Sequence, residues 1–240
     1  MHRFFINSDA IDENGARITG SDVHHIRDVL RLEVDSKIIL LDESATEYEA
    51  VLSEMAADMI VAKIVSSRLP DQPTVKLALF QGLPKGRKFD TVVEKATELG
   101  VDIITPVLTE RCVARPDSPT DARLKRWRRI AEAAAKQSRR PTIPEVNELI
   151  DWSDLAEKLK SFDRVIFFWE AATAPVDDVL LKFDGESLAL IISPEGGLAA
   201  REAESLLSIG AKPAWLGPRI LRTETAPVVA VAIVNHILGR

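Results

Sequence analysis

The chain has 240 residues, of which 46% are hydrophobic and 28% charged, and its formal net charge is −6. This balance is that of a folded globular protein and excludes a collagen, a disordered tail and a disulfide-rich miniprotein. The longest unbroken apolar run, 226–234, is much shorter than the roughly 18 residues that a membrane span needs. The first ten residues do not resemble a secretory signal, and the single cysteine cannot form an internal disulfide, so we expect a cytoplasmic protein.

The charge is unevenly distributed along the chain. Residues 1–70 and 149–240 carry net charges of −6 and −4, whereas residues 71–148 carry 15 basic and 11 acidic side chains. Within the middle part, the segment 123–140 holds eight basic residues and one acidic residue, Glu132. This density is typical of a surface that binds a polyanion, but a solvated helix face has the same composition. Charge alone leaves both interpretations open.

The N-terminal part of the sequence predicts a small β-rich unit. The runs 4–6, 37–41 and 59–65 are β-prone, and the segment from Ser21 to Val29 predicts one short helix. Short strands with a single helix favour a β-barrel. Two prolines within 70–73 then stop both helix and central strand, so we expect one domain over residues 1–70 and a second over 71–240.

From Val75 onward, strand-like runs alternate with amphipathic helices. One predicted helix has an apolar face from Phe89 to Leu99, and another covers 198–209. The alternation predicts a mainly parallel sheet covered by helices. The last helix begins near Pro227 and is apolar almost all round, so it must be buried in the core or against a second subunit. The predicted strands are 75–80, 103–108, 164–169, 188–193 and 213–216.

Unusual residues follow three of these strands, at 168–172, 191–197 and 216–226. Ligands of open α/β sheets bind beyond the carboxyl ends of the strands, and glycines there allow the backbone to approach a ligand closely. The sequence has neither G-x-G-x-x-G nor G-x-x-x-x-G-K-[ST]. The interpretation as a dehydrogenase or a nucleotide-dependent kinase therefore lacks its main support. The four histidines and one cysteine have no metal-ligand spacing, and we expect no metal. Cys112, Trp152 and Trp215 are expected in the core.

Together, Ile-Ser-Pro-Glu-Gly-Gly-Leu at 192–198 and Leu-Gly-Pro-Arg-Ile-Leu-Arg-Thr-Glu-Thr-Ala at 216–226 resemble the RsmE family. Its members are SPOUT-class methyltransferases that act on N3 of a uridine in small-subunit (16S) ribosomal RNA. The likeness extends over nearly the whole chain. Residues 1–5 and 24–31 look like the family's PUA-like domain, and 83–86, 94–100 and Gln137-Ser138 with Arg140 look like its catalytic domain. The chain departs from the family where Ser193 and Arg139 replace glycines and where Asp35-Ser36 replaces a Gly-Asp turn.

The resemblance implies an α/β fold: a SPOUT-type, trefoil-knotted, mainly parallel sheet with helices on both faces, preceded by a small PUA-like β-barrel that binds RNA. It also implies a homodimer and the cofactor S-adenosyl-L-methionine. The implied cofactor-binding residues are Phe168, Trp169, Glu170, Ser193, Pro194, Glu195, Gly196, Gly197, Leu216, Gly217, Ile220, Leu221, Arg222 and Thr223.

Methyl transfer to uridine N3 needs an in-line approach, loss of the N3 proton and stabilisation of the charge left on the base. We expect Arg222 to stabilise that charge. Glu224 is a candidate proton acceptor, but it could equally cap the following helix or pair with Arg222. We expect the substrate, ribosomal RNA, to contact both domains through the phosphate-binding side chains Arg3, Arg31, Lys85, Lys88, Arg139 and Arg140. For Arg31, an ion pair with Asp28 or Glu33 is the rival interpretation.

Two alternatives stay open. A non-catalytic RNA-binding protein with a degenerate methyltransferase domain would explain the basic segment but not the intact cofactor loops. A SPOUT methyltransferase that acts on another RNA would share every feature above. Binding of S-adenosylmethionine distinguishes a methyltransferase from the first alternative. The position of the methyl group in the RNA distinguishes the expected function from the second.

Overall fold

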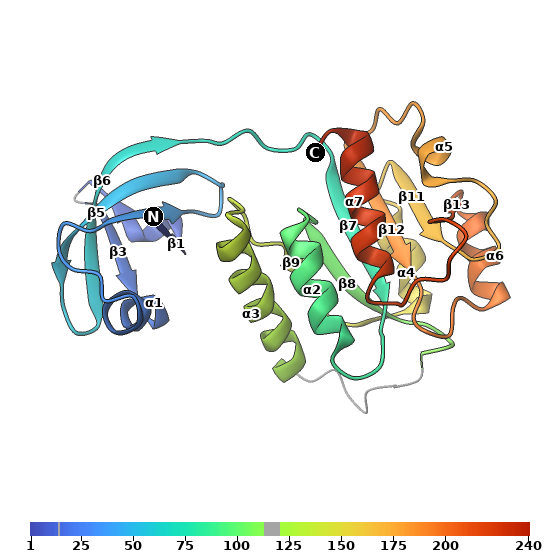
Figure 1. Ribbon diagram of the computed structural model, residues 1–240, viewed down its shortest axis with the longest axis horizontal. Helices are drawn as coiled ribbons and strands as arrows, with labels where there is room; N and C mark the ends of the chain where they lie inside the picture. Colours follow the sequence, from blue (N-terminus) through green and yellow to red (C-terminus); the bar gives the residue numbers. More distant parts are fainter. Residues whose placement is uncertain (14, 113–120) are drawn as a thin grey trace. The chain divides into compact units, whose positions relative to one another are not determined.

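The computed structural model describes residues 1–13, 15–112 and 121–240. The chain divides into two compact units (Figure 1). The first comprises Met1–Gln72 with Lys136–Thr142, and the second comprises Pro73–Ala135 with Ile143–Arg240.

The first unit is built on a six-stranded sheet with the order β1-β4-β5-β6-β3-β2. Strand β1 runs parallel to β4, and the other pairs are antiparallel. The short helix α1 (Ser21–His24) continues as a π-helical turn (His25–Val29) and places Ile26 in the core against Ile38 and Leu52. A 3-10 turn lies at Ser8–Ala10. The strands are β1 His2–Phe5, β2 Ile11–Asp12, β3 Gly15–Thr19, β4 Lys37–Leu41, β5 Glu47–Met55 and β6 Met59–Arg68.

The second unit is built on a seven-stranded sheet with the order β10-β8-β7-β12-β11-β13, in which β9 also pairs with β8. All of its strand pairs are parallel. The strands are β7 Lys76–Gly82, β8 Ile103–Leu108, β9 Glu145–Val146, β10 Ile150–Asp151, β11 Arg164–Phe168, β12 Ser187–Ile192 and β13 Lys212–Ala214.

Helices cover both faces of this sheet. Successive residues of each strand point to opposite sides, and apolar residues on both sides need to be covered. Leu77 and Leu79 of β7 belong to one core cluster, and Ala78 and Phe80 belong to another. The first cluster lies under α2 (Lys88–Glu98), α3 (Asp121–Ser138), α5 (Val176–Leu180) and α7 (Ala226–Leu238); the second lies under α4 (Trp152–Leu159) and α6 (Ala200–Ser208). The sheet is therefore the middle layer of three (Figure 1).

The predicted fold class is confirmed: a mainly parallel α/β sheet with helices on both faces follows a small β-rich unit. Cys112 is buried in the first cluster, as expected. The trefoil knot stays a prediction, because strand order and pairing do not determine how the C-terminal segment threads. Among the described residues, no helix is both long and apolar enough to span a bilayer.

Candidate active site

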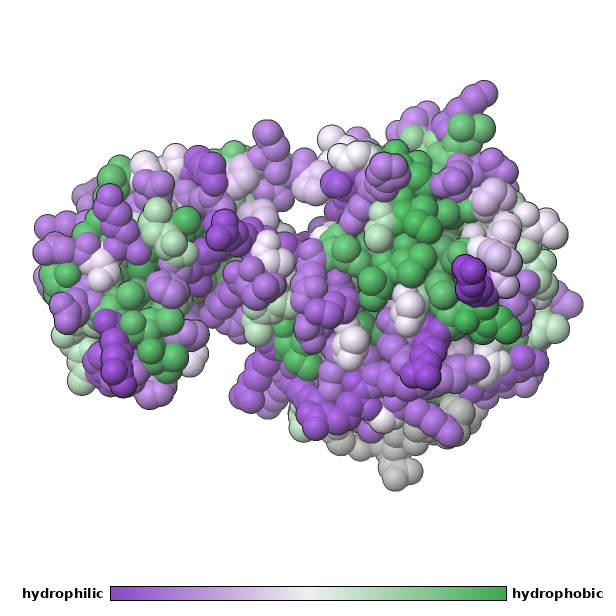
Figure 2. Space-filling view, viewed as in Figure 1, coloured by the Kyte–Doolittle hydropathy of each residue, from purple (hydrophilic) through white to green (hydrophobic). Residues whose placement is uncertain are grey.

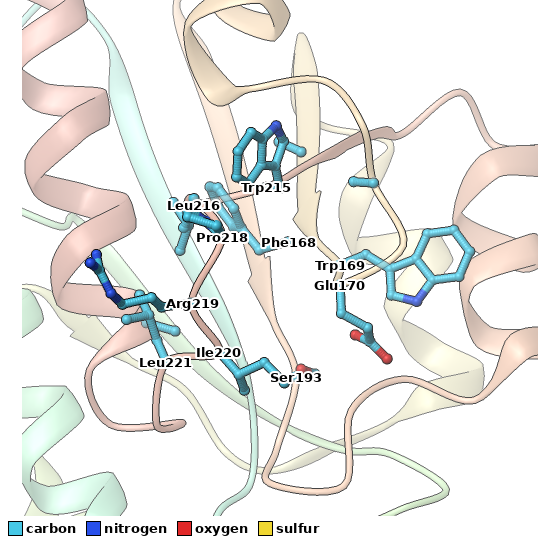
Figure 3. Close-up of a pocket in the computed structure, with 14 residues that line it drawn as sticks. Phe168, Trp169, Glu170, Ser193, Trp215, Leu216, Pro218, Arg219, Ile220 and Leu221 are labelled. Carbon is cyan, nitrogen blue, oxygen red and sulfur yellow. The ribbon is translucent and has the colours of Figure 1, made fainter.

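A cavity of about 270 Å³ lies at the carboxyl ends of β11, β12 and β13 (Figure 3). These ends place it where open α/β sheets bind ligands. Each strand contributes the segment directly after it, and Ala226 at the start of α7 closes the wall. The lining residues are Phe168, Trp169, Glu170, Ala172, Ser193, Ala214, Trp215, Leu216, Gly217, Pro218, Arg219, Ile220, Leu221 and Ala226.

The structure brings the three predicted loops together at this cavity. Eight residues expected to bind the cofactor line it: Phe168, Trp169, Glu170, Ser193, Leu216, Gly217, Ile220 and Leu221. The other six, Pro194, Glu195, Gly196, Gly197, Arg222 and Thr223, lie in the adjoining loops and are not among its lining residues. Their expected contact with the cofactor stays a prediction.

Trp215 corrects a sequence-based expectation. It was expected in the core, but it is only partly buried and forms part of the cavity wall. Its indole Nε1 is shielded from solvent and has no hydrogen-bond partner among the described residues. Trp215 lies directly between the last strand and Leu216, and this position could have indicated from the sequence that it lies in the cavity wall.

The loop 216–221 leaves its backbone polar groups available. In the described part of the chain, no hydrogen bond uses a backbone N–H or C=O of this loop. Gly217 has φ +107°, a conformation that side chains other than glycine rarely adopt, and a Cβ built there would meet nothing within 4 Å. The loop therefore offers donors and acceptors beside open space, which suits a polar heterocycle.

Two carboxylates beside the cavity share one ammonium. Lys88 Nζ lies 2.9 Å from Glu195 Oε1 and 3.4 Å from Glu224 Oε2. Burial raises the pKa of Glu195, but hydrogen bonds from Lys88, from its own backbone N–H and from the backbone N–H of Lys85 outweigh burial, and the pKa lies below its ordinary value. The pKa of Lys88 is raised, chiefly by its hydrogen bond to Glu195. Lys88 thus connects the loop after β12 to the loop before α7.

The two candidate catalytic residues differ in their surroundings. Arg222 is exposed and has no acceptor among the described residues. Glu224 is about one-fifth exposed, and its ion-pair partner is Lys88 rather than Arg222. Its Oε2 is shielded from solvent but accepts no hydrogen bond in the described structure. The residue in the cap position of α7 is Thr225, so Glu224 does not cap that helix.

The cations that were expected to contact RNA differ in their exposure and in their ion pairs. Arg3 is only 10% exposed at its side chain and pairs with buried Glu47, so its guanidinium is used inside the first unit. Lys88 is engaged by the two carboxylates described above. The Arg31 and Lys85 side chains are exposed; Asp28, a rival partner for Arg31, pairs instead with His24 and Arg27. Arg139 is exposed and Arg140 is half-buried.

The rest of the basic segment 123–140 is partly used within the protein. Arg126 pairs with Asp90 of α2, and Arg128 Nε donates to the Val146 carbonyl. Arg123, Lys125 and Arg129 are exposed. The segment is therefore neither wholly a structural face nor wholly a free basic patch. In the described residues, no group of three or more His, Cys, Asp or Glu side chains is arranged to hold a metal ion.

Comparisons with known proteins match both units. Residues 70–235 match the family model of an RNA methyltransferase domain, and residues 18–65 match that of an RNA methyltransferase PUA domain. Ribosomal RNA small subunit methyltransferase E of Bacillus subtilis is 32% identical over 98% of this chain and 96% of its own. The Mycobacterium tuberculosis protein of the same name is 31% identical over 97% of this chain and 91% of its own.

A solved structure agrees over the same length. The ribosomal RNA small subunit methyltransferase E of Neisseria gonorrhoeae, bound to S-adenosyl methionine, has a TM-score of 0.84 and 29% identity, with 99% of this chain and 98% of that chain covered. Fold, cavity and matches define an RNA methyltransferase with an N-terminal PUA domain. Within that class, the chain belongs to the RsmE family.

Proposed function

We propose that this protein transfers a methyl group from S-adenosyl-L-methionine to N3 of a specific uridine in small-subunit ribosomal RNA. The observation that carries the proposal is the cavity at the ends of β11, β12 and β13, whose walls are the loops that resemble the RsmE motifs. The relatives named above support the substrate class, and the cofactor-bound Neisseria structure supports the methyl donor.

The residues of the cavity fit this cofactor. An adenine ring presents donors and acceptors on its edges. The backbone groups of 216–221, which have no partner among the residues that the structure describes, can bond to them. Trp215 and Phe168 supply apolar surface, and the unpartnered Nε1 of Trp215 is a further donor in the wall. We propose that the eight lining residues predicted above contact the cofactor directly and that the six neighbouring ones shape the loops around it.

When bound, the cofactor supplies an electrophilic methyl group on sulfur. The protein would have to hold the uridine so that N3 faces that methyl group. N3 is on the base-pairing edge, so the target base must be unpaired. The N3 proton leaves as the new carbon–nitrogen bond forms. Arg222, whose side chain has no partner in the described part of the chain, stabilises the charge on the base. Glu224, whose Oε2 pairs with Lys88 but accepts no hydrogen bond from the described residues, takes the proton.

RNA contacts come from both units in this proposal. In this proposal residues 1–70 form the PUA-like RNA-binding domain and residues 71–240 the catalytic domain, of which Lys136–Thr142 belongs to the first compact unit. We propose Arg31, Lys85, Arg139 and Arg140 as phosphate contacts that fix register rather than read sequence. Arg3 and Lys88 leave this set because their charges are already paired inside the protein.

We also propose that the protein is a cytoplasmic homodimer that pairs through α7. Helix α7 buries Ala230, Val231 and Val234 in the core, yet Val229 and Ile233 stay partly exposed. Figure 2 shows hydrophobic surface gathered over this helix. Ile220, in the loop just before the helix, is 95% exposed. A contiguous apolar patch of this kind is typical of an interface.

Calorimetric titration with S-adenosylmethionine tests the function, with Gly217→Val as the matched variant. The wild-type protein should bind, and the variant should lose binding by about a hundredfold or more, because valine at φ +107° forces the loop to rearrange. Absence of binding by the wild-type protein would favour the non-catalytic RNA-binding alternative.

A further inference from the structure

Gln81 lies at the carboxyl end of the central strand of the catalytic sheet. Strand β7 is flanked by β8 and β12, and Gln81 pairs with Pro106 on one side and Ile192 on the other. Its side chain is completely buried. It is not among the residues that line the cavity. The steps proposed for methyl transfer do not involve this buried amide.

The amide nitrogen of Gln81 joins three segments that are far apart in the sequence. Nε2 lies 3.0 Å from the Gly82 carbonyl, 3.3 Å from the Ser193 carbonyl and 3.1 Å from Thr223 Oγ1. The Thr223 hydroxyl in turn lies 3.1 Å from the Ser193 carbonyl. That hydroxyl donates its single hydrogen to Ser193 and accepts one from Gln81. The side chains of Gln81 and Thr223 and the carbonyl of Ser193 thus form one closed network at the end of the sheet.

The orientation of the amide is determined by its neighbours. Turning it around would set Oε1 against two carbonyl oxygens, so Nε2 must be the atom that faces them. As a result, Oε1 is buried with no hydrogen-bond partner in the described structure. A buried unpaired acceptor is uncommon in proteins and calls for an explanation. The donations to Ser193 and Thr223 provide one, since an apolar side chain could fill the same space but could not make them.

A second observation shows that the same two segments are in tight contact. A Cβ built on Gly82 would lie 2.4 Å from Pro194 Cδ and 2.6 Å from Pro194 N. The chain at Ser193–Pro194 therefore crosses directly over the end of β7, and no side chain can stand at position 82. Backbone packing at Gly82 and hydrogen bonds at Gln81 thus both keep the segment Ser193–Pro194 against the end of β7.

Both partners of Gln81 belong to loops that contribute residues to the candidate active site. Ser193 lines the cavity, and Thr223 lies two residues after lining residue Leu221 and next to Arg222. Thr223 itself is only 6% exposed, and its hydroxyl is used inside the network. We infer that Gln81 is a positioning residue for methyl transfer: through Ser193 and Thr223 it sets the distance between the two loops that hold the cofactor and Arg222. This inference rests on the proposed function.

The test compares Gln81→Met and the pair Thr223→Val and Thr223→Ser with the wild-type protein. Methionine keeps the length of the side chain but removes the donor. We expect Gln81→Met and Thr223→Val to weaken S-adenosylhomocysteine binding by about tenfold or more in calorimetry and to lower turnover, with RNA affinity unchanged. Thr223→Ser retains the hydroxyl and should restore both properties to near the wild-type values.

Thr97→Val is the matched control. Thr97 is also completely buried and donates its hydroxyl to the Val93 carbonyl, but it lies inside α2. It should lower the melting temperature to the same extent as Thr223→Val and leave cofactor affinity unchanged. If Gln81→Met does not fold, the Thr223 pair decides the question by itself.

The outcomes separate the two claims. If the wild-type protein binds cofactor and Thr223→Val behaves like Thr97→Val, or a folded Gln81→Met binds as tightly as the wild-type protein, the positioning role is overturned and the proposed function stands. If the wild-type protein binds no cofactor, both are overturned.

Discussion

Arg222 is the residue on which the proposed chemistry depends most. It is exposed, follows the cavity-lining residue Leu221, and has no protein partner among the described residues. A preorganised cation that meets charge only as it develops lowers the barrier more than it strengthens binding. Its effect should therefore appear in turnover.

Arg222→Ala should lower turnover by about 10²- to 10³-fold and RNA affinity by less than about tenfold. Single-turnover kinetics with saturating RNA, beside filter-binding affinities, measure the two quantities separately. Exposed Arg219 on the same loop provides the matched control, Arg219→Ala. Equal losses of turnover and affinity in Arg222→Ala would make Arg222 an RNA-binding residue only.

Arg139 combines a backbone constraint with a charge. It stands where the RsmE family usually has glycine, and its φ is +61°, in the left-handed region that costs other residues roughly 1 kcal/mol or more. Its side chain is exposed, in agreement with the proposed phosphate contact.

Arg139→Gly and Arg139→Ala should weaken RNA binding equally, because both remove the charge. Arg139→Gly should nevertheless be the more stable of the two by about 1 kcal/mol in urea unfolding, since only glycine relieves the backbone strain. Equal stability of the two variants would contradict the strained conformation. Unchanged RNA affinity would remove Arg139 from the proposed contacts.

Lys88 differs from Lys85 because its ion pairs connect helix α2 to two loops. Lys88 Nζ contacts Glu195 and Glu224, whereas the contact of Lys85 with Glu195 in the described structure is made by its backbone N–H. Lys88→Met should therefore weaken cofactor binding, by roughly fivefold, and Lys85→Met should not. Lys85→Met should instead lower RNA affinity. The reverse pattern in titrations with cofactor and with RNA would restore Lys88 as an RNA contact.

The Lys88 effect should depend on pH in one direction. Because the pKa of Glu195 is lowered in the folded protein, the ion pair contributes fully above the ordinary glutamate pKa of about 4.3 and is lost as the pH falls through the lowered value. The difference in melting temperature between wild type and Lys88→Met should be largest near neutral pH and disappear in acid. A difference that grows toward low pH would contradict the pairing.

Hydrophobic periodicity predicted the elements of the second unit well and those of the first less completely. Strand β8 coincides with the predicted run 103–108, and α2 covers the predicted apolar face from Phe89. Strand β5, Glu47–Met55, was not predicted, because its acidic residues disguise a strand. Glu47 is buried in it only because Arg3 and Arg68 reach it from other strands.

The candidate site was predictable as far as its motifs and no further. The loops that begin at Phe168, Ser193 and Leu216 carry recognisable sequence, and eight of their predicted residues line one cavity. The roles of Trp215, Lys88 and Gln81 depend on which strand ends and loops meet in space, and no local pattern contains that information. The PUA-like domain and its boundary at residue 70 were suggested by composition, prolines and resemblance together.

The exposed side of α7 provides a test of the proposed homodimer. Val229→Glu places a charge on the partly exposed apolar face of that helix and should convert the proposed dimer to a monomer, because a buried unpaired carboxylate opposes association. Sedimentation velocity measures the change. Leu207→Glu, an equal substitution at a 45% exposed leucine of α6, should leave the dimer intact. A wild-type protein that sediments as a monomer would contradict the proposed interface.

The most direct test of the proposed function is to locate the methyl group. Small-subunit ribosomal RNA lacking the modification would be incubated with the protein and S-adenosylmethionine, then digested and mapped by mass spectrometry, with Arg222→Ala in parallel. We expect 3-methyluridine at a single position with the wild-type protein and little or none with the variant. No methylation, a methyl group on another atom, or equal yield from both proteins would contradict it.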